Sequence, residues 1–186
     1  MVWQEVEQRD KGGAIKMRNN VILIGMPGSG KSTIGVVLAK LLCYQFVDMD
    51  IVIQEQEKKL LREIIADVGN EGFMEIENRV NAGFYAEHTV IAPGGSVIYG
   101  KEAMEHLREI GVVIYLKLSY ENLATRLGDL KARGVVLKDG YTLRTLYEER
   151  TPLYEKYADI IIDEGDMELI DTVAKIKGKL ESNGYI

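Results

Sequence analysis

The sequence predicts a three-layer α/β fold, in which a parallel sheet of five strands carries helices on both faces. Short apolar runs alternate with helical stretches from residue 20 onward, which is typical of strands joined by helical crossovers. The runs are continuously apolar, as expected for strands that are buried on both faces. The chain has 186 residues, which is enough for a single domain with a substantial core.

The first half of the expected sheet comes from three apolar runs. VILIG at residues 21–25 predicts a buried strand, and the spacing of residues 31–42 predicts the first helix. FVDMD at residues 46–50 predicts a short strand that ends in carboxylates. Residues 51–86 have helical spacing, interrupted once by the stretch VGN, and TVIAPGG at residues 89–95 predicts the third strand.

The second half of the chain repeats this alternation. A helix is expected over residues 101–109, and VVIYLK at residues 112–117 predicts the fourth strand. Ser119 is a suitable N-cap for the next helix. Helical spacing returns over residues 142–157, the run ADIIID predicts the fifth strand, and Asp166 is the expected cap of a last helix.

Two segments stand outside the regular pattern. Residues 128–140, GDLKARGVVLKDG, have little periodicity and many charges, so we interpret them as a mobile lid, with a solvated loop as the alternative. Residues 1–16 are polar and contain Gly12-Gly13, which predicts a flexible extension, an ordered extra turn being the alternative. Met17 is the expected natural start, and residues 17–186 are expected to form one domain.

The composition excludes several classes of protein. The formal net charge of −6 disfavours a nucleic-acid or anionic-membrane partner, since both require a basic surface. One cysteine, Cys43, allows no internal disulfide, and no Cys/His spacing of the zinc type is present. No apolar segment is long enough for a membrane helix, and the N-terminus lacks a signal-peptide core. We therefore expect a cytoplasmic protein that acts on a small molecule as a monomer.

The stretch GMPGSGKST at residues 25–33 fits the pattern G-x-x-x-x-G-K-[ST], between an expected strand and an expected helix. Its glycines allow successive backbone N–H groups to point at phosphate oxygens, and the helix adds its positive N-terminal end. This context favours a P-loop NTPase fold over a simple glycine-rich turn.

The same loop predicts a bound nucleoside triphosphate with Mg²⁺. Lys31 is expected to reach the β- and γ-phosphates, and the Ser32 hydroxyl is expected to ligate the metal. Thr33 has the alternative of packing or bonding within the helix. The predicted nucleotide-binding residues of the loop are Gly28, Ser29, Gly30, Lys31, Ser32 and Thr33.

Two carboxylates, Asp48 and Asp50, end the second expected strand. In an open parallel sheet, ligands bind at the carboxyl ends of the strands. Side chains alternate along a strand, so residues two apart, such as these carboxylates, lie on one side. One is expected to hold the metal through water, and the other to accept a hydrogen bond from an acceptor hydroxyl. The alternative is that one of them only caps the following helix.

In order, the chain contains GMPGSGKST, FVDMD, GNEGF with a following IE, IAPGGS, ARGVVL and ERTPLYEKYAD. Together these motifs resemble those of shikimate kinases, which belong to the nucleoside-monophosphate-kinase-like group of P-loop proteins. The resemblance covers nearly everything from Asn20 to Asp163, and its most specific parts are the D-x-D and the R-x-P-L-Y motifs. It implies transfer of the ATP γ-phosphate to a hydroxyl of a small metabolite, with shikimate as the default acceptor.

The resemblance also implies roles for individual residues. Lys31 and Ser32 would act on ATP and Mg²⁺, and Asp48 would hold the metal through water. Asp50 would bind the acceptor hydroxyls and help to orient or deprotonate the attacking one. The remaining implied residues are Gly94 and Gly95 as backbone donors to the acceptor, Arg126 against the adenine, Arg133 in the lid near the phosphates, and Arg150 on the acceptor carboxylate.

Three positions depart from the family pattern. The arginine that would share the carboxylate clamp is Met74, the third glycine of the glycine triplet is Ser96, and the Arg-Pro of the lid is Arg133-Gly134. Methionine makes no hydrogen bond to a carboxylate, so Met74 is the largest change. Arg62 and Arg79 are nearby basic residues, but neither falls at the family position.

These departures leave several interpretations of the function open. The chain is either a shikimate kinase with a rearranged clamp or a related kinase of a sugar acid, another hydroxy acid or a nucleoside monophosphate. A non-catalytic nucleotide-binding regulator is a third reading, disfavoured by intact Lys31, Asp50 and Arg133. For Arg150, the alternative is a surface arginine paired with Glu149 or Glu155.

Overall fold

The computed structural model describes residues 18–127 and 141–186. Its sheet has five strands in the order β2-β3-β1-β4-β5, and every neighbouring pair is parallel. This confirms the predicted α/β fold. The strands are β1 (Asn20–Ile24), β2 (Gln45–Asp48), β3 (Thr89–Ala92), β4 (Gly111–Lys117) and β5 (Ile160–Asp163).

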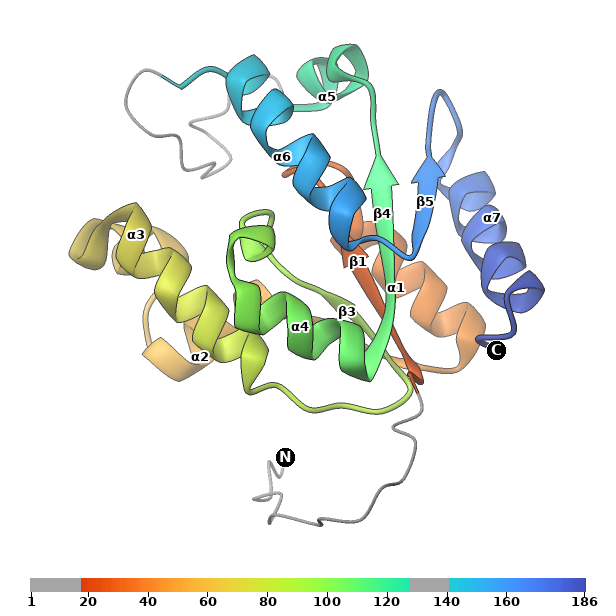
Figure 1. Ribbon diagram of the computed structural model, residues 1–186, viewed down its shortest axis with the longest axis horizontal. Coiled ribbons are helices and arrows are strands. Elements are labelled where there is room, and N and C mark those ends of the chain that lie inside the picture. Colours follow the sequence, from red (N-terminus) through yellow and green to blue (C-terminus); the bar gives the residue numbers. More distant parts are fainter. Residues whose placement is uncertain (1–17, 128–140) are drawn as a thin grey trace.

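Helices cover both faces of this sheet (Figure 1). On β1 the buried side chains alternate, since Val21 and Leu23 pack on one face while Ile22 and Ile24 pack on the other. The first face is covered by α1 (Lys31–Leu42) and α7 (Leu169–Ser182). The opposite face is covered by α2 (Met49–Glu57), α3 (Leu61–Ala82), α4 (Lys101–Ile110), α5 (Tyr120–Leu127) and α6 (Leu143–Tyr157), with the short 3₁₀ helix η1 (Val97–Tyr99).

The order of the strands explains where a ligand site opens. The chain leaves β1 for α1 on one face of the sheet and leaves the adjacent β3 for α4 on the other face. Loops that diverge from neighbouring parallel strands leave a crevice at the carboxyl edge of the sheet. The GMPGSGKST loop and the APGGS loop flank this crevice.

Helix α3 contains the interruption that VGN predicts. Gly69 has φ 72° and ψ −178°, a conformation that is accessible almost only to glycine. The kink divides α3 into a part that follows α2 and a part that carries Phe73, Met74 and Glu77. The glycine therefore sets the direction of the second part of the helix.

Several details of the predicted elements are wrong. The predicted helical stretch 51–86 also breaks at residues 58–60, between α2 and α3, and ends at Ala82. β2 ends at Asp48, and Asp50 lies in the first turn of α2, because the Asp48 side chain accepts a hydrogen bond from Asp50 N (3.0 Å) and caps that helix. The last helix begins at Leu169 with Glu168 as its N-cap, so Asp166 lies before the cap. The predictions for residues 1–16 and for the lid at 128–140, including Arg133 and Gly134, lie outside the described residues.

Candidate active site

A cavity of about 1300 Å³ opens at the carboxyl edge of the sheet. Its walls come from the loops after β1 and β3, from the end of β2 and from helices α1, α2, α3, α5, α6 and α7. The predicted site residues that line it are Gly28, Gly30, Lys31, Ser32, Thr33, Asp48, Asp50, Gly94, Gly95, Arg126 and Arg150. Segments far apart in the sequence therefore meet around one space.

The phosphate loop wraps around Lys31. Gly28 and Gly30 have φ values of 81° and 88°, the left-handed conformation that a curled loop requires. Lys31 Nζ donates hydrogen bonds to the carbonyl oxygens of Gly25 (2.9 Å) and Met26 (3.0 Å). Burial lowers the pKa of Lys31 to about 8, while the carboxylate of Asp50 opposes this shift. The ammonium group therefore lies inside the loop, held by two backbone carbonyl oxygens.

Ser29 is the one predicted loop residue whose side chain is not in the cavity. Its side chain is fully buried, its Oγ has no hydrogen-bond partner among the described residues, and its N–H donates to Met26 O (3.1 Å). The Oγ lies under the loop, because a Cβ on Gly25 would be 2.9 Å from it. Ser29 therefore shapes the loop.

Ser32 and Asp48 join the loop to the end of β2. Ser32 Oγ donates a hydrogen bond to Asp48 Oδ2 (2.7 Å), while Asp48 Oδ1 caps α2. Asp48 thus caps the following helix, which the sequence left as an alternative for one of this pair, while its other carboxylate oxygen is paired with Ser32. The arrangement sets a hydroxyl and a carboxylate side by side at the wall of the cavity.

Asp50 and Glu77 share a confined space next to Gly94. A Cβ at position 94 would lie 2.2 Å from Glu77 Oε1 and 3.1 Å from Asp50 Oδ1, so any larger residue there would displace the Glu77 carboxylate. Burial raises the pKa of Asp50 above its ordinary value, Asp48 adds to the increase, and Lys31 opposes it. Two carboxylates therefore face the cavity from α2 and α3.

Arg150 is buried in the cavity wall, which contradicts the alternative of a surface arginine. Its Nε donates to Tyr99 Oη (3.3 Å), and its guanidinium carbon lies 5.3 Å from the centre of the Tyr99 ring. A Cβ on Gly95 would come within 3.1 Å of Arg150 Nη1, so glycine at 95 allows the guanidinium to approach the loop. Glu155 instead forms an ion pair with Lys117 (2.9 Å).

Tyr154 ties α6 to the same loop. Its Oη donates a hydrogen bond to Gly95 O (2.6 Å), and its ring stacks on Tyr115 of β4 at 5.1 Å between centroids. Tyr154 is fully buried. This contact fixes the helix that carries Arg150 against the loop after β3.

At the other end of the cavity, Arg126 donates from Nη1 to Glu164 Oε2 (3.0 Å). Burial raises the pKa of Glu164, and the adjacent Arg126 opposes the increase. Both residues line the cavity together with Met167 and Leu169. This region combines a planar cation with apolar side chains, a combination that can bind the face of a heterocycle.

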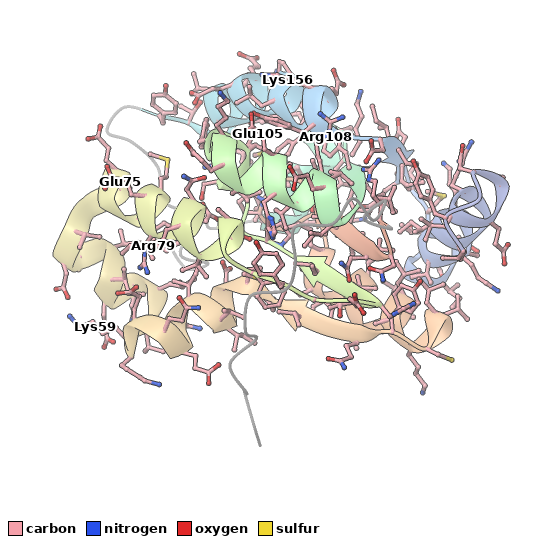
Figure 2. All side chains as sticks on the ribbon, turned by 60° about the horizontal axis from the view of Figure 1, so that its bottom comes forward. Lys59, Glu75, Arg79, Glu105, Arg108 and Lys156 are labelled. Atoms are coloured by element: carbon pink, nitrogen blue, oxygen red, sulfur yellow. The ribbon has the colours of Figure 1, made fainter. Side chains whose placement is uncertain are left out.

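Met74 lines the cavity from α3, where the family pattern has an arginine. Arg62 lines the cavity too and is exposed, so it is a basic residue within reach of an acceptor. Arg79 is not part of the lining. Its Nη2 pairs with Glu57 Oε1 on α2 (2.7 Å), and Figure 2 shows Arg79 on the side of α3 that faces α2.

Glu77, Tyr99 and Glu164 were not among the predicted site residues. A signal for Glu77 was present, because Phe73, Glu77 and Val80 share the buried stripe of a helix. A carboxylate within an apolar stripe indicates a partner or a function. Tyr99 and Glu164 carry no comparable pattern, since they reach the cavity from a 3₁₀ turn and from the end of β5.

Other kinds of site receive no support from the described residues. Residues 18–127 and 141–186 contain no group of three or more His, Cys, Asp or Glu side chains that could hold a metal by themselves. Within these same ranges, no helix has the length and apolar character needed to cross a bilayer. Cys43 is a free, exposed thiol.

Comparisons with known proteins agree with this geometry. A family model described as shikimate kinase matches residues 27–181. Shikimate kinase of Clostridium botulinum (strain Eklund 17B / Type B) is 34% identical over 163 residues, which is 86% of this chain and 98% of that protein. Shikimate kinase of Trichormus variabilis is 40% identical over 147 residues, which is 77% of this chain and 80% of that protein.

Solved structures give the same result. A shikimate kinase from Acinetobacter baumannii, in complex with shikimate, has a TM-score of 0.80 at 29% identity and covers 91% of this chain and 96% of its own. The shikimate kinase of Aquifex aeolicus has a TM-score of 0.76 at 28% identity, with coverage of 89% and 98%.

Proposed function

The chain belongs to the shikimate kinase family, and from that premise we propose how its residues divide the work. It is an ATP-dependent kinase that transfers a phosphoryl group to a hydroxyl of a small metabolite, with shikimate as the default acceptor. The observation that carries the proposal is the meeting of Lys31, Asp50 and Arg150 around one cavity.

The phosphate half of the cavity binds ATP. The N–H groups of the loop and the N-terminus of α1 attract the phosphates, and the Lys31 ammonium moves from its carbonyl partners to the β- and γ-phosphates. Arg126 lies against the adenine. Arg133, in the predicted lid, reaches the phosphates during transfer.

Mg²⁺ fits the oxygen pair on the adjoining wall. Ser32 Oγ and Asp48 Oδ2 are 2.7 Å apart, and hard cations prefer hydroxyl, carboxylate, phosphate and water oxygens. Ser32 would bind the metal directly and Asp48 through water. When bound, Mg²⁺ neutralises negative charge on the phosphates. Most of its ligands would be phosphate and water oxygens, so no group of three acidic side chains is needed.

In the transfer step, an acceptor hydroxyl oxygen attacks the γ-phosphorus in line with the leaving oxygen of ADP. A new P–O bond forms as the bond to the bridging oxygen of ADP breaks, and the hydroxyl proton passes to Asp50. The raised pKa of Asp50 makes it a better proton acceptor than an ordinary aspartate. Lys31 stabilises the charge that develops on the transferred group.

The acceptor half of the cavity orients the substrate. Arg150 binds the acceptor carboxylate, and backbone groups at Gly94 and Gly95 approach the ring because neither residue has a side chain. Tyr99 holds Arg150 through its hydroxyl and its ring. A cytoplasmic location, a monomeric state and a lack of nucleic-acid partners stay predictions.

A coupled assay of ADP release tests this function. The acceptors to compare are shikimate, quinate, gluconate and nucleoside monophosphates, each against the rate with ATP alone. We expect shikimate to raise ADP release well above the background, with a dependence on added Mg²⁺. A rate that no acceptor raises above the ATP-only background would contradict the proposal.

A further inference from the structure

Glu77 is a buried carboxylate that has no role in the proposed phosphoryl transfer. It is 1% exposed, and no ion pair reaches it from the described residues. Oε2 accepts a hydrogen bond from Ser96 Oγ (2.5 Å), whereas Oε1 is buried and has no hydrogen-bond partner in the described part of the chain. One of the two Glu77 carboxylate oxygens, at the wall of the cavity, therefore has no hydrogen bond from the described residues.

Asp50 increases the electrostatic cost of ionising Glu77. Glu77 Oε1 and Asp50 Oδ1 approach the same edge of Gly94, so two carboxylates compete for one small space. Like charges this close disfavour ionisation of both groups. Burial raises the pKa of Glu77 to about 7, with Asp50 adding to the increase and the hydrogen bond from Ser96 opposing it.

The charges that face Glu77 come from three other elements. Lys31 on α1 and Arg150 on α6 are positive, and Asp50 on α2 is negative. Helix α4 also packs against α3, but its Glu102 faces away and accepts a hydrogen bond from Asn78 at the surface. Met74, three residues before Glu77 and therefore on the same side of α3, adds no charge.

An anionic acceptor would thus enter a site with one cation fewer than the family pattern provides. We propose that Glu77 is a specificity-determining residue that takes up a proton from solvent when a carboxylate-bearing acceptor binds. The proton adds to Oε1, and Oε2 keeps its hydrogen bond from Ser96. Neutralising Glu77 removes one negative charge beside the acceptor, which replaces part of the electrostatic effect of the missing arginine. This inference rests on the proposed function.

The sign of the expected pH dependence follows from linkage. An anion beside Glu77 favours its protonated form, so binding raises the pKa of Glu77 above its value of about 7 in the free protein. Affinity for the anionic acceptor is therefore highest below pH 7 and falls as the pH rises through that value. The total decrease is about tenfold for each unit by which binding raises the pKa.

Calorimetric titration of the full chain with shikimate tests the proposal without relying on turnover. Binding is measured between pH 6 and 9 in two buffers that differ in ionisation enthalpy, which gives the number of protons taken up. We expect uptake of up to one proton near pH 7.5 and weaker binding at pH 9. The methyl ester of shikimate, which is neutral, should bind without this pH dependence.

Glu77→Gln is the decisive variant, because glutamine has nearly the same shape and can still accept a hydrogen bond from Ser96. It should bind shikimate without proton uptake and with an affinity that no longer falls at high pH. Glu75→Gln is the matched control, since Glu75 is exposed on the same helix (Figure 2) and should behave as the wild type.

Ser96→Ala provides a second variant in case Glu77→Gln does not fold. The hydrogen bond from Ser96 stabilises the ionised form of Glu77, so its loss should move the decrease in affinity to higher pH. Binding of shikimate without proton uptake, or an unchanged pH profile in Glu77→Gln, overturns the inference while leaving the kinase function intact. No ADP release with shikimate at any pH contradicts the proposed function, and the inference with it.

Discussion

The two halves of the cavity are built in different ways. The part expected to hold the phosphates comes from one continuous stretch, residues 25–33, with Asp48 hydrogen-bonded to it through Ser32. The acceptor half is assembled from separate elements, namely α2, α3, the loop after β3 and α6. A contiguous, backbone-made site follows its motif closely. A site made of separate side chains can change at one position without disturbing the others, as at Met74.

The largest expected effect is in the phosphate half. Lys31→Ala removes the cation that stabilises charge on the transferred group, and we expect kcat to fall by about a thousandfold or more. ADP release at saturating shikimate measures it. Lys40→Ala, on the exposed side of the last turn of α1, is the control and should keep the wild-type rate. A loss of less than tenfold in Lys31→Ala would show that the loop does not hold the phosphates as proposed.

The next effect belongs to the acceptor half. Arg150→Met leaves a bound carboxylate without its charged partner, and we expect the KM for shikimate to rise about a hundredfold with little change in the KM for ATP. Lys156→Gln on the same helix is the control, because Lys156 is exposed at the surface (Figure 2) and its ammonium lies 5.1 Å from the centre of the Tyr157 ring. Equal increases in both constants would mean that the two halves are not separable.

Met74→Arg should act in the opposite direction. An arginine there can form a second charged hydrogen bond to the carboxylate, so we expect the KM for shikimate to fall by about tenfold. A permanent cation beside Glu77 also favours its ionised form, so the gain should be greatest at high pH. KM measured at pH 6.5 and 8.5 tests both statements. No decrease at either pH would indicate that the cavity is shaped for a different acceptor.

The smallest expected effect concerns the kink of α3. Gly69→Ala meets no neighbouring atom within 4 Å, so its cost comes from a backbone conformation that alanine avoids. We expect the free energy of unfolding to fall by about 1–3 kcal/mol, with a higher KM for shikimate and an unchanged KM for ATP. Chemical denaturation and steady-state kinetics measure these changes.

Gly178→Ala gives the matched control for that prediction. Gly178 lies in α7 and has no atom within 4 Å of an added Cβ, but its φ is not positive. Alanine at this position should raise stability by up to about 1 kcal/mol and leave both KM values unchanged. A shift in the shikimate KM of this control would assign the Gly69 effect to general destabilisation.

The elements that the sequence predicts well depend on local pattern. The runs around Ile22 and Ile114 are continuously apolar, and both form central strands of the sheet. The phosphate loop can be recognised directly in the sequence, because its glycines and Lys31 lie in one short stretch. Asp50 was expected in a strand with the same side-chain period as Asp48. It lies in a helix, because capping by Asp48 ends the strand two residues earlier than the pattern indicates.

The hydrogen bond between Ser96 and Glu77 could not be predicted from the sequence. The two residues are separated by 19 positions, and their contact depends on how α3 packs against the loop after β3. Ser96 therefore looked like a mild change from glycine, whereas it supplies the hydrogen bond that a buried carboxylate needs. Tertiary packing, rather than local propensity, decides which departures from a family pattern matter.

Gly94 has a consequence for how such a pocket can evolve. A side chain at this position would displace the Glu77 carboxylate and come close to Asp50, so substitution is disfavoured at the centre of the acceptor site. Position 74 is half-buried and borders open cavity, so it accepts side chains of different size and charge. New acceptor preferences are therefore expected to arise by substitutions along one face of α3, while the glycine beside them stays fixed in every descendant that still transfers phosphate.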